Sequence, residues 1–182
     1  MVQKEIRVDW KNTCNLTIGA ALLAEKRATS SSINNQLEDE LYQYFKKELP
    51  NNPKFPGKKP SGDVVAAMKM AIDPNFNYNV KFAIPNKQND NDLTSIIKAK
   101  IDSGTVVGVS GLFRRPGHKN GDAKHIIEIV GYNDKGWIVN DPFGKFENAK
   151  WGHSGMQGTM ELYEYGQHDL TKRKAYWLEQ KK

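Results

Sequence analysis

Apolar residues are spaced for helices in the first part of the chain and for strands in the last part. Helical spacing of apolar positions, together with a capping residue at Ser61, predicts four helices. We expect them over residues 14–28, 36–48, 61–72 and 92–102. Gly104 follows the last of these segments and is a residue that commonly ends a helix.

Short apolar runs then replace the helical pattern and predict strands over residues 106–110, 125–132, 137–140, 158–165 and 174–179. The turn residues 133–136 join two of these runs into a β-hairpin. Helices followed by antiparallel strands predict an α+β domain, with N-terminal helices packed on a C-terminal antiparallel sheet. We expect one domain over 1–182, helical to about residue 103 and sheet from about 104 onward.

Composition narrows the class of protein. The chain has 182 residues and a net charge of +6, with a pI near 9.2. This charge favours anionic surroundings such as nucleic acid, a bacterial cell wall or membrane headgroups, and does not choose among them. No nucleic-acid-binding motif accompanies the basic residues, so we expect no nucleic-acid partner. No apolar stretch reaches the roughly 18 residues of a membrane helix, and the N-terminus lacks the apolar run of a signal peptide. We therefore expect synthesis in the cytoplasm, of this chain or of a longer protein.

Cys14 is the single cysteine of the chain, which excludes an internal disulfide. A lone cysteine is often a small buried apolar residue. Cys14, however, opens a predicted helix, where unpaired N–H groups and partial positive charge stabilise a thiolate. The same N–H groups can stabilise an oxyanion during acyl transfer. The position therefore favours a nucleophile.

His125 opens an apolar strand and Asp141 follows the strand that pairs with it. The hairpin turn brings these two strand ends together, so an acidic side chain can orient the imidazole. Alternation leaves two residues open for this task, Asp141 and its neighbour Asn140, and we favour Asp141. The other histidines lie in polar segments and show no ligand-like spacing, so we expect no metal site and no cofactor; they are His118, His153 and His168.

The tract 125–144, HIIEIVGYNDKGWIVNDPFG, resembles the histidine-to-aspartate segment of the C39-like cysteine peptidases. The segment TCNLT around Cys14 resembles the nucleophile segment of phage-encoded, wall-acting members. The resemblance implies a papain-like cysteine peptidase fold with Cys14, His125 and Asp141 as the catalytic residues. Many relatives carry a glutamine before the cysteine as an oxyanion donor. This sequence has Val8 and Asp9 there, so a neutral Asp9 or Asn12 would supply the donor, and a catalytically weakened, binding-only domain is an alternative.

The resemblance implies hydrolysis of an amide bond. We expect the bond to lie in bacterial peptidoglycan, cut by a phage endolysin or tail-associated lysin that is delivered to the wall by release or by the virion. Both an endopeptidase and an amidase fit. A protease that removes leader peptides is the alternative enzyme. Trp10 and Trp137 are the residues we expect to contact substrate.

Overall fold

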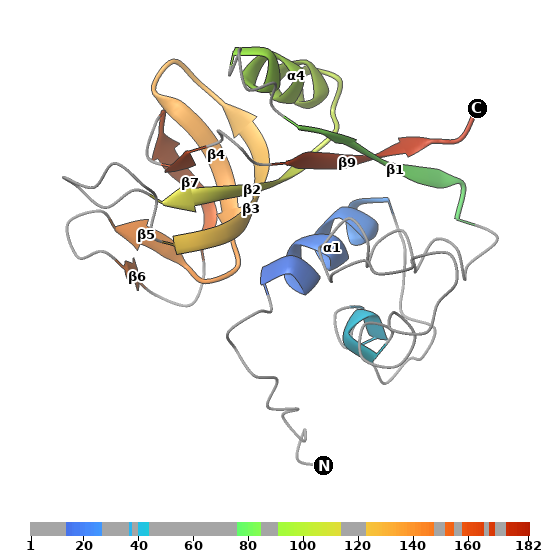
Figure 1. Ribbon diagram of the computed structural model, residues 1–182, viewed down its shortest axis with the longest axis horizontal. Coiled ribbons are helices and arrows are strands. Elements are labelled where there is room, and N and C mark those ends of the chain that lie inside the picture. The colour runs from blue at the N-terminus through green and yellow to red at the C-terminus, as the bar shows by residue number, and fades with distance from the viewer. Residues whose placement is uncertain are drawn as a thin grey trace.

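The computed structural model describes residues 14–26, 37, 40–43, 76–84, 91–113, 123–147, 152–154, 158–165, 168–169 and 174–182 (Figure 1). Its two labelled helices are α1 (Cys14–Glu25) and α4 (Asn91–Asp102). The strands are β1 (Tyr78–Ala83), β2 (Val107–Phe113), β3 (Ala123–Tyr132), β4 (Gly136–Asp141), β5 (Lys145–Glu147), β6 (Gly152–Ser154), β7 (Gly158–Glu164), β8 (His168–Asp169) and β9 (Ala175–Gln180).

The main sheet has the strand order β1-β9-β2-β3-β4-β7, and β8 adds to β2. All of its pairings are antiparallel, which confirms the predicted antiparallel sheet. A separate two-stranded sheet consists of β5 and β6. The proposed division at residue 103 is too simple, because β1 lies before it and pairs with β9. The papain-like arrangement remains a prediction.

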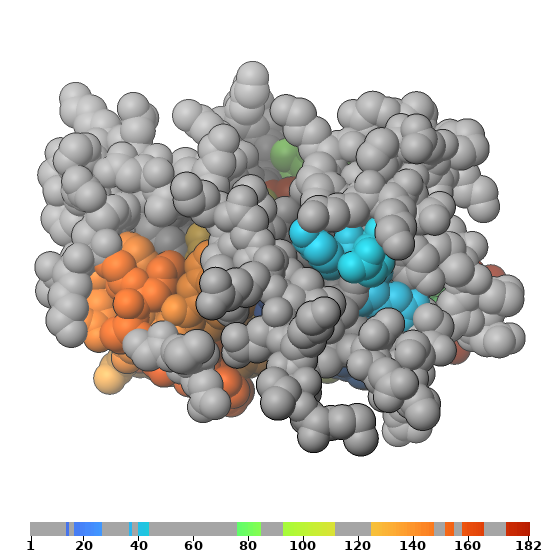
Figure 2. All heavy atoms as spheres, turned by 90° about the horizontal axis from the view of Figure 1, so that it is seen from below, coloured from blue at the N-terminus to red at the C-terminus, as the bar shows by residue number. Residues whose placement is uncertain are grey.

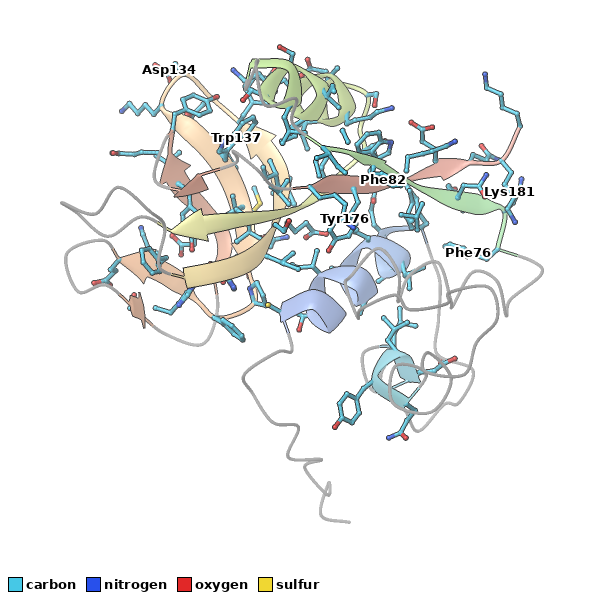
Figure 3. The ribbon with its side chains drawn as sticks, viewed as in Figure 1. Phe76, Phe82, Asp134, Trp137, Tyr176 and Lys181 are labelled. Atoms are coloured by element: carbon cyan, nitrogen blue, oxygen red, sulfur yellow. The ribbon has the colours of Figure 1, made fainter. Side chains whose placement is uncertain are left out.

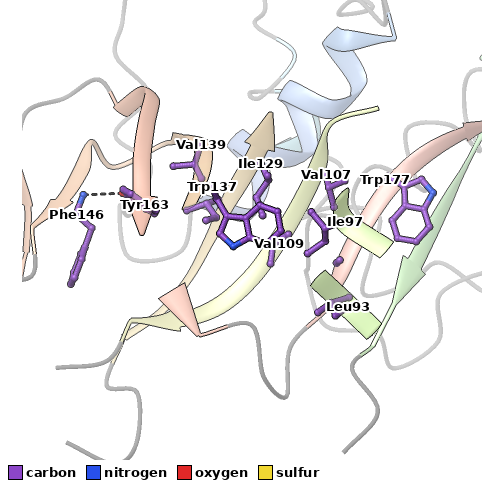
Figure 4. Close-up of a cluster of buried hydrophobic side chains, with 12 residues drawn as sticks. Leu93, Ile97, Val107, Val109, Ile129, Trp137, Val139, Phe146, Tyr163 and Trp177 are labelled. Carbon is purple, nitrogen blue, oxygen red and sulfur yellow. Dashed lines mark hydrogen bonds between the residues drawn. The ribbon is translucent and has the colours of Figure 1, made fainter. Parts of the chain in front are cut away.

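Helices cover both faces of the main sheet. One buried cluster lies on the face of the sheet that carries α4 and extends to β5 (Figure 4). Its residues are Leu93, Ile97, Val107, Val109, Ile127, Ile129, Trp137, Val139, Phe146, Tyr163, Ala175 and Trp177. A second cluster lies between the sheet and α1 and consists of Ile18, Leu22, Leu23, Leu41, Phe76, Tyr176 and Leu178. In β9 the two clusters take alternate residues, as expected for a strand buried on both faces. Figure 3 shows Tyr176 between β9 and α1.

The predicted helices agree with the structure where it describes them. The helix expected over 92–102 is α4, and the turn after it contains Gly104 with φ +77°, a left-handed conformation that suits glycine. The first helix ends at Glu25 rather than residue 28. Residues 37 and 40–43 are helical within the segment expected over 36–48, whereas 61–72 lie outside the described residues. Within the described ranges, no helix is long and apolar enough to cross a membrane.

The predicted strands all exist, but several boundaries differ. β2 continues to residue 113 and β3 starts at residue 123, so both extend beyond the strands predicted over 106–110 and 125–132. β1 was not predicted, because its residues alternate between half-buried and exposed and form no apolar run. β5, β6 and β8 were also missed. They have two or three residues each and are too short to give a periodic signal.

Candidate active site

Cys14 is the first residue of α1, as predicted, and it is 8% exposed. α1 packs against β2, β3 and β9. The packing over β2 is close, since a Cβ atom on Gly108 would lie 3.0 Å from the Cγ2 atom of Ile18. In Figure 1, β3 begins on the side of the first turn of α1 and ends beside α4. The helix therefore carries the thiol to the end of the sheet where β3 begins.

His125 and Asp141 form a direct pair at this end of the sheet. The Nε2 atom of His125 lies 2.7 Å from the Oδ1 atom of Asp141, and both side chains are buried. The ring of Phe143 stacks on the imidazole, with centroids 5.0 Å apart and planes 17° apart. The imidazole is thus held on its edge by a carboxylate and on its face by an aromatic ring.

A β-bulge decides which acidic or amide side chain meets the histidine. Next to the turn, Gly131 pairs with Ile138, and this register would place Asn140 on the face of β3 that carries His125. The register shifts between Ile129 and Gly131, so that Glu128 pairs with Asn140 instead. Asp141 then falls on the face of His125, because residues opposite each other share a face.

Asn140 consequently faces the other way and serves a different carboxyl group. Its side-chain Nδ2 donates a hydrogen bond of 2.7 Å to Oε2 of Glu128, and its Oδ1 accepts one from the backbone N–H of Met160. Burial raises the pKa of Glu128 above the usual glutamate value, the bond from Asn140 opposes this, and the charge of Glu25 adds to it.

The Asp141 carboxylate is surrounded by donors. Oδ1 also accepts a hydrogen bond of 2.9 Å from the backbone N–H of Phe143, and Oδ2 accepts one of 2.5 Å from the Tyr163 hydroxyl. Burial alone would raise the pKa of Asp141, but its bonds with His125, His153 and Tyr163 hold that pKa well below the usual aspartate value. Burial, with the Asp141 charge, raises the pKa of Tyr163. Since Asp141 is ionised and can only accept, Nε2 of His125 carries the proton between them.

His153 is a site residue that the sequence did not reveal. Its Nε2 lies 3.3 Å from Oδ2 of Asp141, and its ring meets the His125 ring edge-on with centroids 4.9 Å apart. Its strand β6 pairs with β5, opposite Phe146. No periodic pattern marks such a short strand. The closeness of His153 to Asp141 in the sequence is the one signal that could have suggested a role for it. The ligand atoms of His125, Asp141 and His153 all lie within 4.8 Å of one another.

Trp137 lies far from this pair. Trp137 pairs with Tyr132, which lies seven residues after His125 on β3. Seven residues of a strand span a distance of roughly 20 Å. Its side chain is 3% exposed and belongs to the cluster beneath α4, near the hairpin tip marked by Asp134 in Figure 3. The indole therefore has almost no surface to offer a substrate. Trp10, Asp9 and Asn12 lie outside the described residues.

The sequence of the chain matches the profile of a known protein family. The sequence profile of the Peptidase_C39 like family matches residues 1–168. The chain belongs to this family. A search of curated proteins found no match. Membership in the Peptidase_C39 like family makes the protein a peptidase, and hence a hydrolase, with a cysteine peptidase as the class that the family suggests.

Proposed function

We propose that the protein is a thiol-dependent hydrolase that cleaves an amide bond in bacterial peptidoglycan. The observation that carries the catalytic part is the buried pair of His125 and Asp141 at the end of the sheet where α1, opened by Cys14, packs. The family membership supports peptide hydrolysis. The net charge of +6 supports an anionic substrate, since a basic surface attracts a wall that carries teichoic acid.

In the proposed mechanism, Cys14 is the nucleophile and His125 moves its proton. Nε2 of His125 is bonded to Asp141, so Nδ1 is the nitrogen that takes the proton from the thiol. The resulting imidazolium is stabilised by the ionised Asp141. The thiolate attacks the carbonyl carbon and forms a tetrahedral oxyanion. His125 then returns the proton to the leaving amine, and water hydrolyses the thioester with His125 as the base.

The oxyanion needs donors, and the first turn of α1 supplies backbone N–H groups that have no partner within the helix. We propose the backbone N–H of Cys14 as one donor, and Asn12 or a neutral Asp9 as the second. Loss of one such donor typically lowers turnover by roughly 10²–10³-fold. Replacing Asn12 with Ala therefore tests this assignment through kcat.

The test is the clearance of purified bacterial walls by the wild type and by Cys14→Ala, followed as loss of turbidity. We expect the wild type alone to clear the walls. Mass spectra of the released fragments then distinguish an endopeptidase, which cuts within the stem peptide, from an amidase, which frees the stem peptide from the sugar. Equal clearance by both proteins would show that Cys14 is not the nucleophile.

A second readout separates the alternative functions. If neither protein acts on walls from several species, hydrolysis of a peptide library by the wild type favours a leader-peptide protease. If peptides also stay intact, the alkylation rate of Cys14 by iodoacetamide near neutral pH decides. Fast alkylation indicates an activated thiol with an untested substrate class, whereas slow alkylation that rises only on unfolding indicates a binding-only domain.

A further inference from the structure

Two imidazoles and one carboxylate converge at the end of the sheet where β3 begins, and this combination is a zinc-type ligand set. Zinc sites with an open position commonly use histidines with one carboxylate. Here the potential ligand atoms of His125, Asp141 and His153 lie within 4.8 Å of one another. We propose that these three residues form an inhibitory binding site for a divalent transition-metal ion of the zinc class.

The distances suit such an ion after a small adjustment. Tetrahedral zinc with bonds of about 2.0–2.1 Å places its ligand atoms about 3.3 Å apart. The Nε2 atom of His153 already lies 3.3 Å from Oδ2 of Asp141. The distance of 2.7 Å between Nε2 of His125 and Oδ1 of Asp141 has to increase by about 0.6 Å once the ion replaces the proton between them. No pair has to change by more than about 1.5 Å, and His153 lies on β6, which pairs with β5 and not with the main sheet.

The surroundings hold the three side chains in place as the outer partners of metal ligands do. Tyr163 and the backbone N–H of Phe143 donate to the two Asp141 oxygens. Phe143 stacks on His125, and Phe146 meets the ring of His153 with centroids 5.2 Å apart. Such partners fix ligand orientation before the ion arrives. The His153 side chain is 22% exposed, which gives the ion a path for entry. In Figure 2, orange atoms from the part of the chain that includes β4 to β7 lie at the surface.

Metal binding at this place opposes the proposed hydrolysis, so the inhibitory effect rests on the proposed function while the binding does not. The ion takes the lone pair of Nε2, which must lose its proton. In neutral His125 that proton moves to Nδ1, and in the imidazolium it leaves to solvent. Either way Nδ1 is protonated and cannot act as a base, neither for the Cys14 thiol nor for the water that hydrolyses the thioester. The enzyme is then switched off without any change at the thiol itself.

The deciding experiment measures zinc binding in a protein without the thiol, which is the obvious competing ligand. Metal-free Cys14→Ala is titrated with Zn²⁺ by calorimetry, alongside Cys14→Ala/His153→Gln and Cys14→Ala/His153→Phe. Gln keeps a donor near Asp141 but is a poor zinc ligand, and Phe suits the aromatic surroundings. Thermal unfolding without zinc confirms that each variant is folded. Co²⁺ in place of Zn²⁺ reports four-coordinate binding through its visible absorption.

We expect Cys14→Ala to bind one ion per chain and both His153 variants to bind it more than about 100-fold more weakly, since even outer partners of a metal ligand are worth roughly 10–100-fold. Absence of binding to Cys14→Ala, or equal binding by a folded His153 variant, overturns the proposal. With the thiol present, we expect Zn²⁺ to inhibit the wild type, EDTA to restore its activity, and Zn²⁺ to inhibit His153→Gln less. If no wall activity exists, the calorimetric result still stands and only the proposed function fails.

Discussion

Removing one buried hydroxyl tests how tightly the candidate site is built into the fold. Tyr163 is completely buried, and its hydroxyl donates to Oδ2 of Asp141 at 2.5 Å. The same hydroxyl accepts the backbone N–H of Phe146 at 2.8 Å, the bond dashed in Figure 4. Tyr163→Phe deletes both bonds and leaves that N–H buried without its acceptor. A hydrogen bond to a charged group contributes about 1.5–3 kcal/mol, and a buried unsatisfied donor costs about 1–3 kcal/mol.

The two contributions overlap, because the surroundings relax, so we expect Tyr163→Phe to lower the free energy of unfolding by about 3 kcal/mol. For a chain of this size, that corresponds to a fall in Tm of about 6–12 °C. If about 1.4 kcal/mol of the loss is expressed as poorer positioning of Asp141 in the transition state, turnover falls about tenfold. Urea unfolding, thermal unfolding and wall clearance measure these effects.

The chain offers a matched control two residues away. The hydroxyl of Tyr165 donates to the backbone carbonyl of Asn133 at 2.8 Å, but Tyr165 is exposed. Water replaces that bond, so Tyr165→Phe should change stability by no more than about 0.5 kcal/mol and leave turnover intact. If Tyr163→Phe is as stable as Tyr165→Phe, the account of Asp141 as a carboxylate held by Tyr163 is wrong.

Three further predictions test other parts of the structure. Asp141→Ala should lower wall clearance by roughly 10²-fold or more, because it removes the partner of His125. Asn140→Ala should keep most of the activity, because the Asn140 side chain contacts Glu128 instead of His125. Equal losses would contradict the register given by the bulge. Because the pKa of Glu128 is raised in the folded state, its contribution to stability is greatest below pH about 4.5 and is lost as pH rises through the folded pKa. Glu128→Gln should therefore be more stable than the wild type at pH 7, and this gain should vanish near pH 4. Urea midpoints across pH measure the difference, and a difference that does not change with pH would refute the argument. Gly136→Ala places a Cβ 2.1 Å from the backbone oxygen of Tyr163 and should lower the free energy of unfolding by about 3 kcal/mol. Gly104→Ala meets no atom within 4 Å and should lower it by about 1 kcal/mol, because of the positive φ at this position. Urea unfolding measures both losses, and similar losses would mean that the contact between β4 and β7 relaxes freely.

Local sequence signals were sufficient for the elements that carry Cys14, His125 and Asp141. The apolar run after His125 and the turn at residues 133–136 predict a hairpin, and the structure has the Asn133 side chain accepting the N–H groups of Lys135 and Gly136 in that turn. A hairpin brings its distant strand ends together whatever the rest of the fold is. The hairpin alone therefore brings together the strand ends that carry His125 and Asp141, whereas the choice between Asp141 and Asn140 depends on the register.

His153 could not be predicted in the same way, because its position depends on contacts that local pattern does not encode. β6 has three residues, and it reaches Asp141 only through pairing with β5 and packing of Phe146 against the His153 ring. Gly158 contributes as well, since a Cβ there would lie 2.7 Å from the backbone oxygen of Asp141. These approaches are tertiary, and a polar stretch of sequence is equally compatible with a solvated loop.

The choice between Asp141 and Asn140 shows how a single residue of register determines chemistry. A regular hairpin from the 133–136 turn would present Asn140 to His125 and turn Asp141 toward the opposite face of the strand pair. The shift between Ile129 and Gly131 reverses both side chains. No glycine with positive φ marks the shift, since Gly131 has a negative φ, so nothing in the sequence of this strand locates it. A carboxylate rather than an amide therefore faces the imidazole, and only a carboxylate supplies the full charge that stabilises an imidazolium or contributes to a cation site.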